Sequence, residues 1–423
     1  MILAEKIYQK FNNLKSKDGI KDFFVFYDDY RSLHINQKSK EFHRENELNK
    51  YREHSKGYFV ILWDDHLFSH GNINAASMDD FDLFIEKSKE LAMPYEAEIF
   101  IPERGIYPMV IAYSKSLADM VDIPEYLLKT MKVATELDVM AGADCGATQI
   151  QAVEGARYAF SSRNVDESYL YTQFSLKKSV GHEVDWNIQT AGIIPMEHLH
   201  EVMSFLGDTY QSMLSEQVHA DTATSALLSP AIFKKVFHDQ IVLPLQGSEI
   251  LQGNGIFTIE DFKNRTRALG NLSFSYDPLI SHKPGSYRFT SYGLKAQRQH
   301  FVKFGKLETP ILDNMNYSRL GYSKPTVELA SFANLKIDGL KRRIFREIRS
   351  SSQNVLFGVS HFSYRKADKG LVRIGFDRPI IMHNGKMNVG EPCELEINLI
   401  ELLQNNRIEL VEFPDGQIGA LIK

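Results

Sequence analysis

The chain has 423 residues, of which 43% are hydrophobic and 24% charged, and this balance excludes a disordered protein. The formal net charge of -5 gives no electrostatic basis for nucleic-acid binding. Cys145 and Cys393 are the only cysteines, so a disulfide framework is excluded and a reducing compartment is favoured. No apolar stretch reaches the length of a membrane span, about 18 residues. The first residues lack the apolar core of a signal peptide. We therefore expect a cytoplasmic protein of two domains.

Apolar spacing predicts a first helix over residues 3–14, whose leucine, isoleucine and phenylalanine side chains share one face. Short apolar or alternating runs then predict strands that pair as hairpins into an antiparallel sheet. These runs cover residues 23–27, 31–36, 58–63 and 66–69. Ser77 followed by Asp80 resembles a capping box and predicts a helix that Pro94 ends.

The predicted elements continue with a helix that starts at Pro124, strands at 148–153, 157–161 and 169–176, and a helix over about 196–214. The polar, small-residue segment 215–226 marks a domain boundary, which we place after residue 215. The expected fold class is α+β, and residues 1–215 form an antiparallel sheet with helices on one face. Pro230 opens a helix in residues 216–423, where glycines punctuate short segments and predict a β-rich, barrel-like or sandwich-like domain.

Two histidine-containing stretches fail the zinc-protease pattern. After His182-Glu183 the helical motif needs a second histidine three residues beyond the glutamate, and that position is Trp186. His198 and His200 lie two residues apart in the helix predicted over 196–214, where their side chains point in opposed directions and cannot share a metal. Both stretches are interpreted as solvated surface groups.

The remaining candidates for chemistry are single residues or pairs. Cys145 could act as a nucleophile, but nothing identifies a histidine partner, and a free cysteine is more often a small buried hydrophobe. His238-Asp239 follows Pro230 in an apolar helix, and periodicity alone makes it a polar pair on an amphipathic helix. By themselves, these residues define no active site.

Four stretches of the second half carry a resemblance to a known family. They are 227–248, beginning Leu-Leu-Ser-Pro; 301–321, with Asn-Tyr-Ser-Arg-Leu-Gly; 384–392, beginning Asn-Gly-Lys; and Asp415-Gly416-Gln417. In order and spacing they resemble the C-terminal domain of the TldD/TldE (PmbA, modulator of DNA gyrase) peptidase family. Residues 27–35 and 57–68 resemble the family's N-terminal domain. The resemblance therefore implies a two-domain protein of the metallopeptidase family.

The resemblance also implies where the family's zinc site falls. Catalytic members hold a His-Glu-x-x-x-His motif, and a gapless alignment on Gly247 places His238 at its first metal histidine. Asp239 then takes the catalytic glutamate and Leu243 the second metal histidine, while the family's zinc cysteine falls at Glu412. Leucine cannot ligate a metal, and zinc proteases need three protein ligands. We therefore expect no catalytic residue and no bound metal in this chain.

The function implied is that of a TldE-like, non-catalytic subunit. Such subunits pair with a catalytic TldD-like subunit that carries the zinc, and the pair processes unfolded or leader peptides. Two alternatives stay open. One is a stand-alone homodimeric pseudo-protease that binds peptides, and the other is an active peptidase with an unrecognised site, such as Cys145 or a metal held by His238 and Glu412. No nucleic-acid or membrane partner is expected.

Subunit association should involve the glycine-rich stretch between Phe274 and Phe304, where aromatic residues are frequent. Aromatic side chains are enriched at contact hot spots. The alternative is that these rings fill the core of the β-rich domain.

Overall fold

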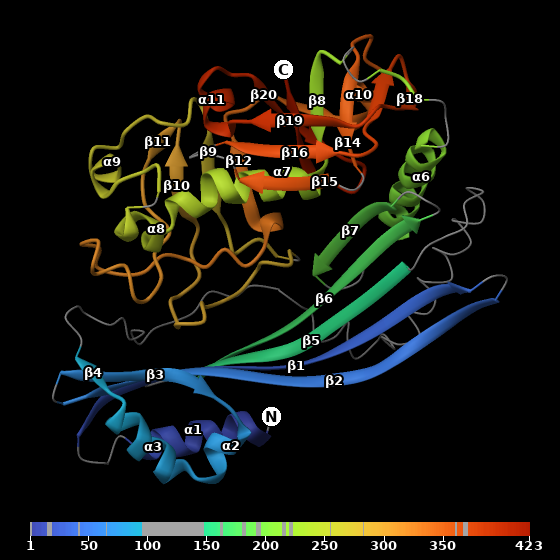
Figure 1. The fold of residues 1–423 in the computed structure, drawn as a ribbon. Coiled ribbons are helices and arrows are strands. Elements are labelled where there is room, and N and C mark those ends of the chain that lie inside the picture. The colour runs from blue at the N-terminus through green and yellow to red at the C-terminus, as the bar shows by residue number, and fades with distance from the viewer. Residues whose placement is uncertain are drawn as a thin grey trace.

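A large antiparallel sheet with helices on one face forms the first part of the fold (Figure 1). The computed structural model describes residues 2–14, 19–40, 43–64, 66–94, 148–160, 164–179, 183–191, 196–213, 217–219, 223–253, 255–281, 283–359, 362–366 and 371–423. The strands lie in the order β4-β3-β2-β1-β5-β6-β7, and all neighbouring pairs are antiparallel. They are β1 (Ile20–Lys40), β2 (His43–Trp63), β3 (Leu67–Ile73), β4 (Met93–Pro94), β5 (Thr148–Phe160), β6 (Asn164–Ser179) and β7 (Glu183–Ala191). The helices on this face are α1 (Ile2–Leu14), α2 (Ala75–Asp79) and α3 (Phe81–Glu90), whereas α6 (Met196–Met213) packs against the second part of the chain.

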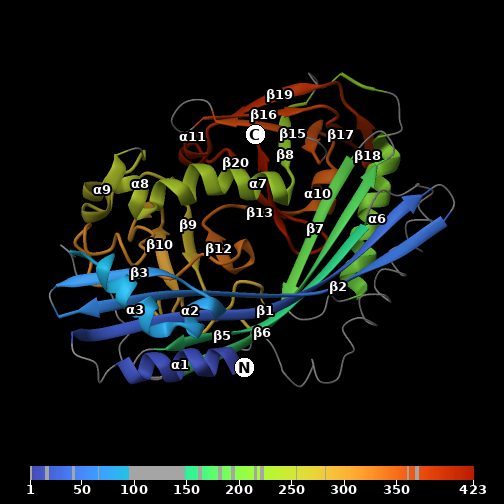
Figure 2. The ribbon, with the colours of Figure 1, turned by 60° about the horizontal axis from the view of Figure 1, so that its bottom comes forward.

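The start of β1 is apolar without alternation because the sheet is buried on both faces there. Phe23, Val25 and Tyr27 pack with residues of α1, α2 and α3. Phe24 and Phe26 point to the opposite face, since successive strand side chains alternate. The residues they contact, from the second part of the chain, are Phe289, Tyr292 and Leu294. Figures 1 and 2 show the same arrangement, with α1–α3 on one side of the sheet and the later elements on the other.

Three sheets and several short helices make up the second part. The largest sheet has the order β13-β20-β21-β8-β14-β17-β18 and contains two parallel pairs, β13–β20 and β8–β14. The others have the orders β11-β10-β9-β12 and β15-β16-β19. The strands are β8 (Ser225–Leu228), β9 (Ser273–Tyr276), β10 (Gln299–Lys303), β11 (Lys306–Leu307), β12 (Leu335–Asp338), β13 (Arg342–Ile344), β14 (Val355–Gly358), β15 (Phe362–Lys366), β16 (Val372–Phe376), β17 (Ile380–His383), β18 (Lys386–Val389), β19 (Cys393–Ile397), β20 (Ile408–Glu412) and β21 (Ile418–Ile422). The helices are α7 (Pro230–Phe237), α8 (Gly247–Gln252), α9 (Ile259–Lys263), α10 (Phe345–Arg349) and α11 (Leu399–Gln404). A single apolar core joins α7 to all three sheets.

A second contact between the two parts of the chain centres on Trp186 of β7. Its ring lies 5.0 Å from that of Phe205 and 5.3 Å from that of Phe413, between ring centroids. Its indole Nε1 donates a hydrogen bond of 2.7 Å to Asp415 Oδ2, in the turn between β20 and β21. Trp186, which breaks the zinc pattern after His182, is therefore a buried docking residue, while His182 itself lies outside the described residues.

The α+β class and the β-rich second part are confirmed, and no closed barrel occurs among the described residues. The first helix and the helix over 196–214 are confirmed as α1 and α6. None of the described helices is long and apolar enough to cross a membrane. The helix predicted from Pro124 and the domain boundary after residue 215 lie outside the described residues.

Several predicted boundaries are wrong. The strands predicted at 23–27 and 31–36 are one strand, β1, and those at 148–153 and 157–161 are one strand, β5. The capping box at Ser77 does not form. Instead, Asn74 caps α2 by accepting from Ser77 N–H at 3.0 Å, and Asp80 caps α3 by accepting from Leu83 N–H. Asparagine and aspartate are as good at this position as serine.

The aromatic residues expected at a subunit interface lie instead in the core. All but one of them are at most 7% exposed, namely Phe274, Tyr276, Tyr287, Phe289, Tyr292 and Phe301. Phe304, at the turn between β10 and β11, is the exception and is 65% exposed. Burial of the others follows from the connection between β9 and β10, whose described residues 277–281 and 283–298 fold back over β9 and dock on β1.

We expect replacement of Glu409 by glutamine to destabilise the fold most at neutral pH. The Glu409 side chain is 7% exposed and pairs with Arg343 at 2.7 Å, Lys341 at 3.6 Å and Lys423. Burial raises the pKa of Glu409, but the hydrogen bond from Lys423 and the nearby positive charges outweigh it, so the pKa lies below 4.5. A lowered pKa means that the carboxylate stabilises the fold above pH 4.5, and that this contribution is lost as the pH falls through the folded pKa.

Urea unfolding measures this effect. Glu409→Gln should lower the free energy of unfolding by about 1–3 kcal/mol at pH 7, because three cationic side chains lose a buried, charged acceptor. The difference from the original protein should shrink on acidification towards pH 3. Glu260→Gln is the control: its carboxylate is 64% exposed and pairs with Lys263, so its loss should cost at most about 1 kcal/mol. A pH-independent loss in Glu409→Gln would contradict this role.

Candidate functional site

The helix that carries His238 and Asp239 changes its geometry at His238. Pro230 takes the first position of α7, where its missing N–H costs no hydrogen bond. From His238 to Val242 the chain forms a π-helical turn, closed by a hydrogen bond from Leu243 N–H to the His238 carbonyl. Pro244 then interrupts helical bonding, because it has no N–H to donate. Turns of this kind are rare and occur frequently at functional sites.

Gln240 anchors the π-helical turn to the neighbouring elements. Its side chain is buried, and its Nε2 donates to the Ile397 carbonyl at 2.9 Å. Its Oε1 accepts from Leu399 N–H at 2.5 Å, at the start of α11. The turn is therefore held in place by two buried hydrogen bonds to a distant part of the chain.

The π-helical turn relates the two positions at which the motif that this segment resembles has histidines. The bond between residues five apart brings position 243 one turn beyond position 238. In the motif both positions are histidines, so such a turn suits two ligands of one metal. Here Leu243 offers no donor atom. The side chains present at these positions therefore do not fit a zinc ion.

The environment of Asp239 makes its carboxylate a weak base. His238 Nδ1 lies 3.0 Å from Asp239 Oδ1 and must donate, because an ionised carboxylate only accepts. Lys366 Nζ lies 3.7 Å from Asp239 Oδ2. Burial raises the pKa of Asp239, but these partners outweigh it and hold the pKa below 3.8. A general base works best with a pKa near the working pH, so Asp239 is poorly suited to activate water.

Tyr364 of β15 lies beside the same carboxylate. Burial raises the pKa of its phenol, and the charge of Asp239 raises it further. The two side chains interact without the geometry of a full hydrogen bond. Lys235 Nζ lies 4.5 Å from the centre of the Tyr364 ring, a cation–π distance. Asp239 is thus the acidic centre of a group of cationic and phenolic side chains.

Glu412 does not join this group. It ends β20, where its neighbours in register are Ile344 of β13 and Ile418 of β21, and its side chain is exposed. Strand alternation places it on the face of Ile408 and Leu410, which belong to the core beneath α7. Within the described part of the chain, no three histidine, cysteine, aspartate or glutamate side chains come close enough to hold a metal.

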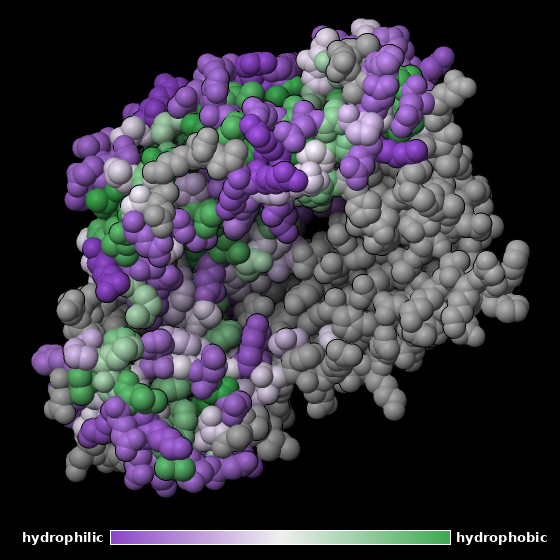
Figure 3. Space-filling view, in the orientation of Figure 1, coloured by the Kyte–Doolittle hydropathy of each residue, from purple (hydrophilic) through white to green (hydrophobic). Residues whose placement is uncertain are grey.

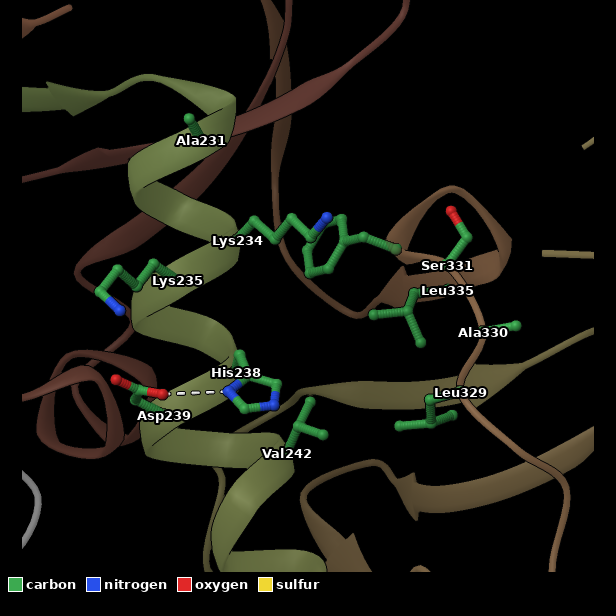
Figure 4. A pocket seen from close by; sticks show the side chains of 11 residues that line it. Ala231, Lys234, Lys235, His238, Asp239, Val242, Leu329, Ala330, Ser331 and Leu335 are labelled. Atoms are coloured by element: carbon green, nitrogen blue, oxygen red, sulfur yellow. Dashed lines mark hydrogen bonds and ion pairs between the residues drawn. The ribbon is translucent and has the colours of Figure 1, made fainter. Parts of the chain in front are cut away.

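A pocket of about 330 Å³ opens beside His238. One wall is α7 with its π-helical turn, and the other is the segment 329–335 (Figure 4). The surface is hollowed beneath α7 and β15, where hydrophilic residues border apolar ones (Figure 3). The lining residues are Ala231, Lys234, Lys235, His238, Asp239, Val242, Leu329, Ala330, Ser331, Phe332 and Leu335.

The sequence identifies only part of this site. It singles out His238 and Asp239, which the structure brings into contact, and the spacing of Lys234 and His238 by four residues could have revealed their shared face. Tyr364 and Lys366 carry no local signal, because only the tertiary fold brings β15 beside α7. Cys145 lies outside the described residues, so the structure does not address it as a nucleophile.

Comparison with known proteins gives one family and several similar folds. Residues 221–412 match the model of the PmbA/TldA metallopeptidase C-terminal domain. The fold is similar to TldE from Thermococcus kodakarensis, with a TM-score of 0.73, 13% identity, and coverage of 99% of this chain and 98% of that one. It is also similar to a protein described as a modulator of DNA gyrase from Bacteroides thetaiotaomicron, with a TM-score of 0.71, 12% identity, and coverage of 99% of this chain and 97% of that one. A second protein described as a modulator of DNA gyrase, from Thermotoga maritima, has a TM-score of 0.70, 11% identity, and coverage of 99% of this chain and 98% of that one. A search among curated proteins gives no match.

The family match covers the segment that carries the candidate site. It includes α7, the π-helical turn, the pocket wall 329–335 and β15, and it ends at Glu412. The structural neighbours cover nearly the whole chain with the same fold. Residues 221–412 therefore form a C-terminal domain of the TldD/TldE (PmbA) family, and the chain as a whole shares the fold of the TldE and DNA gyrase modulator structures.

Proposed function

We propose that this chain is a non-catalytic, TldE-like subunit of a heteromeric zinc peptidase that processes unfolded or leader peptides. The observation that carries the proposal is Leu243, which stands one π-helical turn beyond His238 without a donor atom. A catalytic zinc needs three protein ligands and an open position. The low basicity of the Asp239 carboxylate supports the same conclusion. The zinc and the water-activating residue are then supplied by a TldD-like partner.

The role of such a subunit is to complete a chamber and hold the peptide. The described sheets offer edge strands, such as β12 and β15, that have a strand neighbour on one side only. An extended peptide can add to an edge of this kind through main-chain hydrogen bonds. The proposal also divides the chain into two domains, 1–215 and 216–423. It includes a cytoplasmic location, which the low cysteine content supports.

Co-purification from the native host tests the proposed partnership. Native mass spectrometry of the tagged chain should show a complex with a second protein of the family that retains an intact His-Glu-x-x-x-His motif. An obligate contact of this kind buries more than about 2,000 Å² in total, so the complex should survive gel filtration at micromolar concentration. Recovery of homodimers alone would favour a stand-alone peptide-binding protein, and recovery of monomers alone would leave no chamber to complete. Either result would overturn the proposal.

A further inference from the structure

The pocket beside His238 has the size and shape of a subsite for a small group. Its volume of about 330 Å³ lies at the lower end of the range for ligand pockets, about 300–1,000 Å³. It therefore suits one or two amino-acid residues better than a large cofactor. Apolar side chains supply most of the lining on the side of the segment 329–335, namely Leu329, Ala330, Phe332 and Leu335.

The far wall of the pocket is held rigidly. The hydroxyl of Tyr276, a buried residue, accepts hydrogen bonds from Ala330 N–H at 3.0 Å and Ser331 N–H at 3.3 Å. The same hydroxyl donates to the Gly285 carbonyl at 2.7 Å. Phe332 packs edge-on against two rings of α7, at centroid distances of 6.1 and 5.9 Å. A wall fixed in this way loses little freedom when a ligand binds.

The charges at the pocket are mostly positive. Its lining holds two lysines and one carboxylate, and that carboxylate, Asp239, already faces His238 and Lys366. Lys235 lies over the Tyr364 ring. Lys234 extends from α7 towards the segment 329–335 (Figure 4). No ion pair joins the Lys234 ammonium to a carboxylate in the part of the chain that the structure describes.

We propose that this pocket binds the free C-terminus of an extended peptide whose last side chain is apolar. Lys234 pairs with the terminal carboxylate, and Val242, Leu329 and Leu335 enclose the last side chain. The assignment rests on the proposed function, because it names the part of the peptide that this subunit holds. β12 begins at Leu335, in the pocket wall, and pairs with β9 along one side. A peptide that pairs with the first residues of β12, on the side of β12 away from β9, would place the C-terminus of the peptide in the pocket.

Binding of labelled peptides to the purified full chain tests this assignment. The probes are a fluorescein-labelled hexapeptide that ends in leucine, as the free acid and as the C-terminal amide, followed by fluorescence anisotropy. The free acid should bind about tenfold more tightly, because only the acid forms a charge-assisted pair with Lys234. Unlabelled 4-methylpentanoate, which has the carboxylate and the leucine-like tail without a peptide, should compete at least about tenfold less well than the unlabelled peptide acid.

Variants separate the charge from the apolar wall. Lys234→Met should reduce the affinity for the acid to that for the amide and leave the amide unchanged. Leu329→Ser should weaken both probes, since both carry the leucine side chain. Lys263→Met is the matched control, because Lys263 lies in α9, pairs with Glu260 at 2.8 Å and does not line the pocket. It should leave both affinities unchanged. Circular dichroism confirms that each variant is folded.

Three results would overturn the inference: equal affinity for acid and amide, an unchanged preference in Lys234→Met, or competition by 4-methylpentanoate equal to that of the peptide acid. The last result would mean that the pocket takes a free carboxylic acid. If any of these occurs while the chain still co-purifies with a zinc-bearing partner, the subsite assignment fails and the proposed function stands. If no partner is found, the proposed function fails whatever the peptides show.

Discussion

Replacement of Gly305 by alanine should unfold a large share of the protein. Gly305 lies in the turn between β10 and β11 with a φ of +77°. A Cβ there would lie 2.0 Å from the carbonyl oxygen of Gly270, a backbone atom that cannot rotate away. Gly270 is itself confined, because a Cβ on it would lie 2.2 Å from the Leu403 carbonyl oxygen at the end of α11. The substitution therefore forces two backbone segments apart.

The expected cost combines two effects. Left-handed backbone strain in a non-glycine residue costs about 1–3 kcal/mol, and overpacking costs about 1–3 kcal/mol more. Their sum is a large part of a typical stability of about 5–15 kcal/mol. The hydrogen bonds of Gly305, from its N–H to the Leu272 carbonyl at 2.7 Å and from Ala268 N–H to its own carbonyl at 2.9 Å, would be strained as well.

Urea unfolding and soluble yield measure this effect, and Gly321→Ala is the matched control. Gly321 has nearly the same φ, +79°, but no atom lies within 4 Å of the position of its Cβ. Gly321→Ala should therefore lose only the stability that the backbone strain costs, about 1–3 kcal/mol. Equal losses in the two variants would show that the contact with Gly270 has no energetic weight.

Local signals predicted the elements whose stability is local. The spacing of Ile7, Phe11 and Leu14 predicted α1, and these three side chains are fully buried in its core. The strands were predicted too short, because β1 continues without a break through residues 28–30, between the two predicted runs, where no apolar alternation occurs. It continues there because β2 and β5 pair with it on both sides, from Asp28 to Gln37. Pairing with distant segments is not visible in the composition of one strand.

The candidate site, too, was predicted only where the signal is local in the sequence. The resemblance located His238, Asp239 and Leu243, but no propensity predicted the π-helical turn that relates them. That turn depends on Gln240, whose two partners lie in and just after β19, far along the chain. The aromatic stretch was expected at an interface because aromatic side chains are enriched at contact hot spots. The structure buries its rings through the fold of the connection between β9 and β10, which the sequence pattern does not reveal.

Peptide hydrolysis should depend wholly on the partner. Leu243 leaves no metal site with His238, so the isolated chain should cleave no faster than buffer. A mixture with the zinc-bearing partner should cleave the peptide at least about 10³-fold faster than the isolated chain or the buffer does, as expected for enzymatic catalysis. His238→Ala in this chain should leave the activity of the mixture within about threefold, because Leu243 gives the His238 ring no second ligand with which to hold a metal and its Nδ1 donates to Asp239. Replacing the first motif histidine of the partner is the matched control and should abolish activity.

Turnover of a fluorogenic unfolded peptide by the isolated chain and by the mixture, each with and without His238→Ala, tests the central claim most directly. The account predicts no turnover by the isolated chain, turnover by the mixture, and nearly the same turnover when His238 is alanine. Zinc added to the isolated chain should not create activity, since Leu243 leaves the ligand set incomplete. Turnover by the isolated chain that is lost in a folded His238→Ala variant would contradict the account and identify this chain as the catalyst.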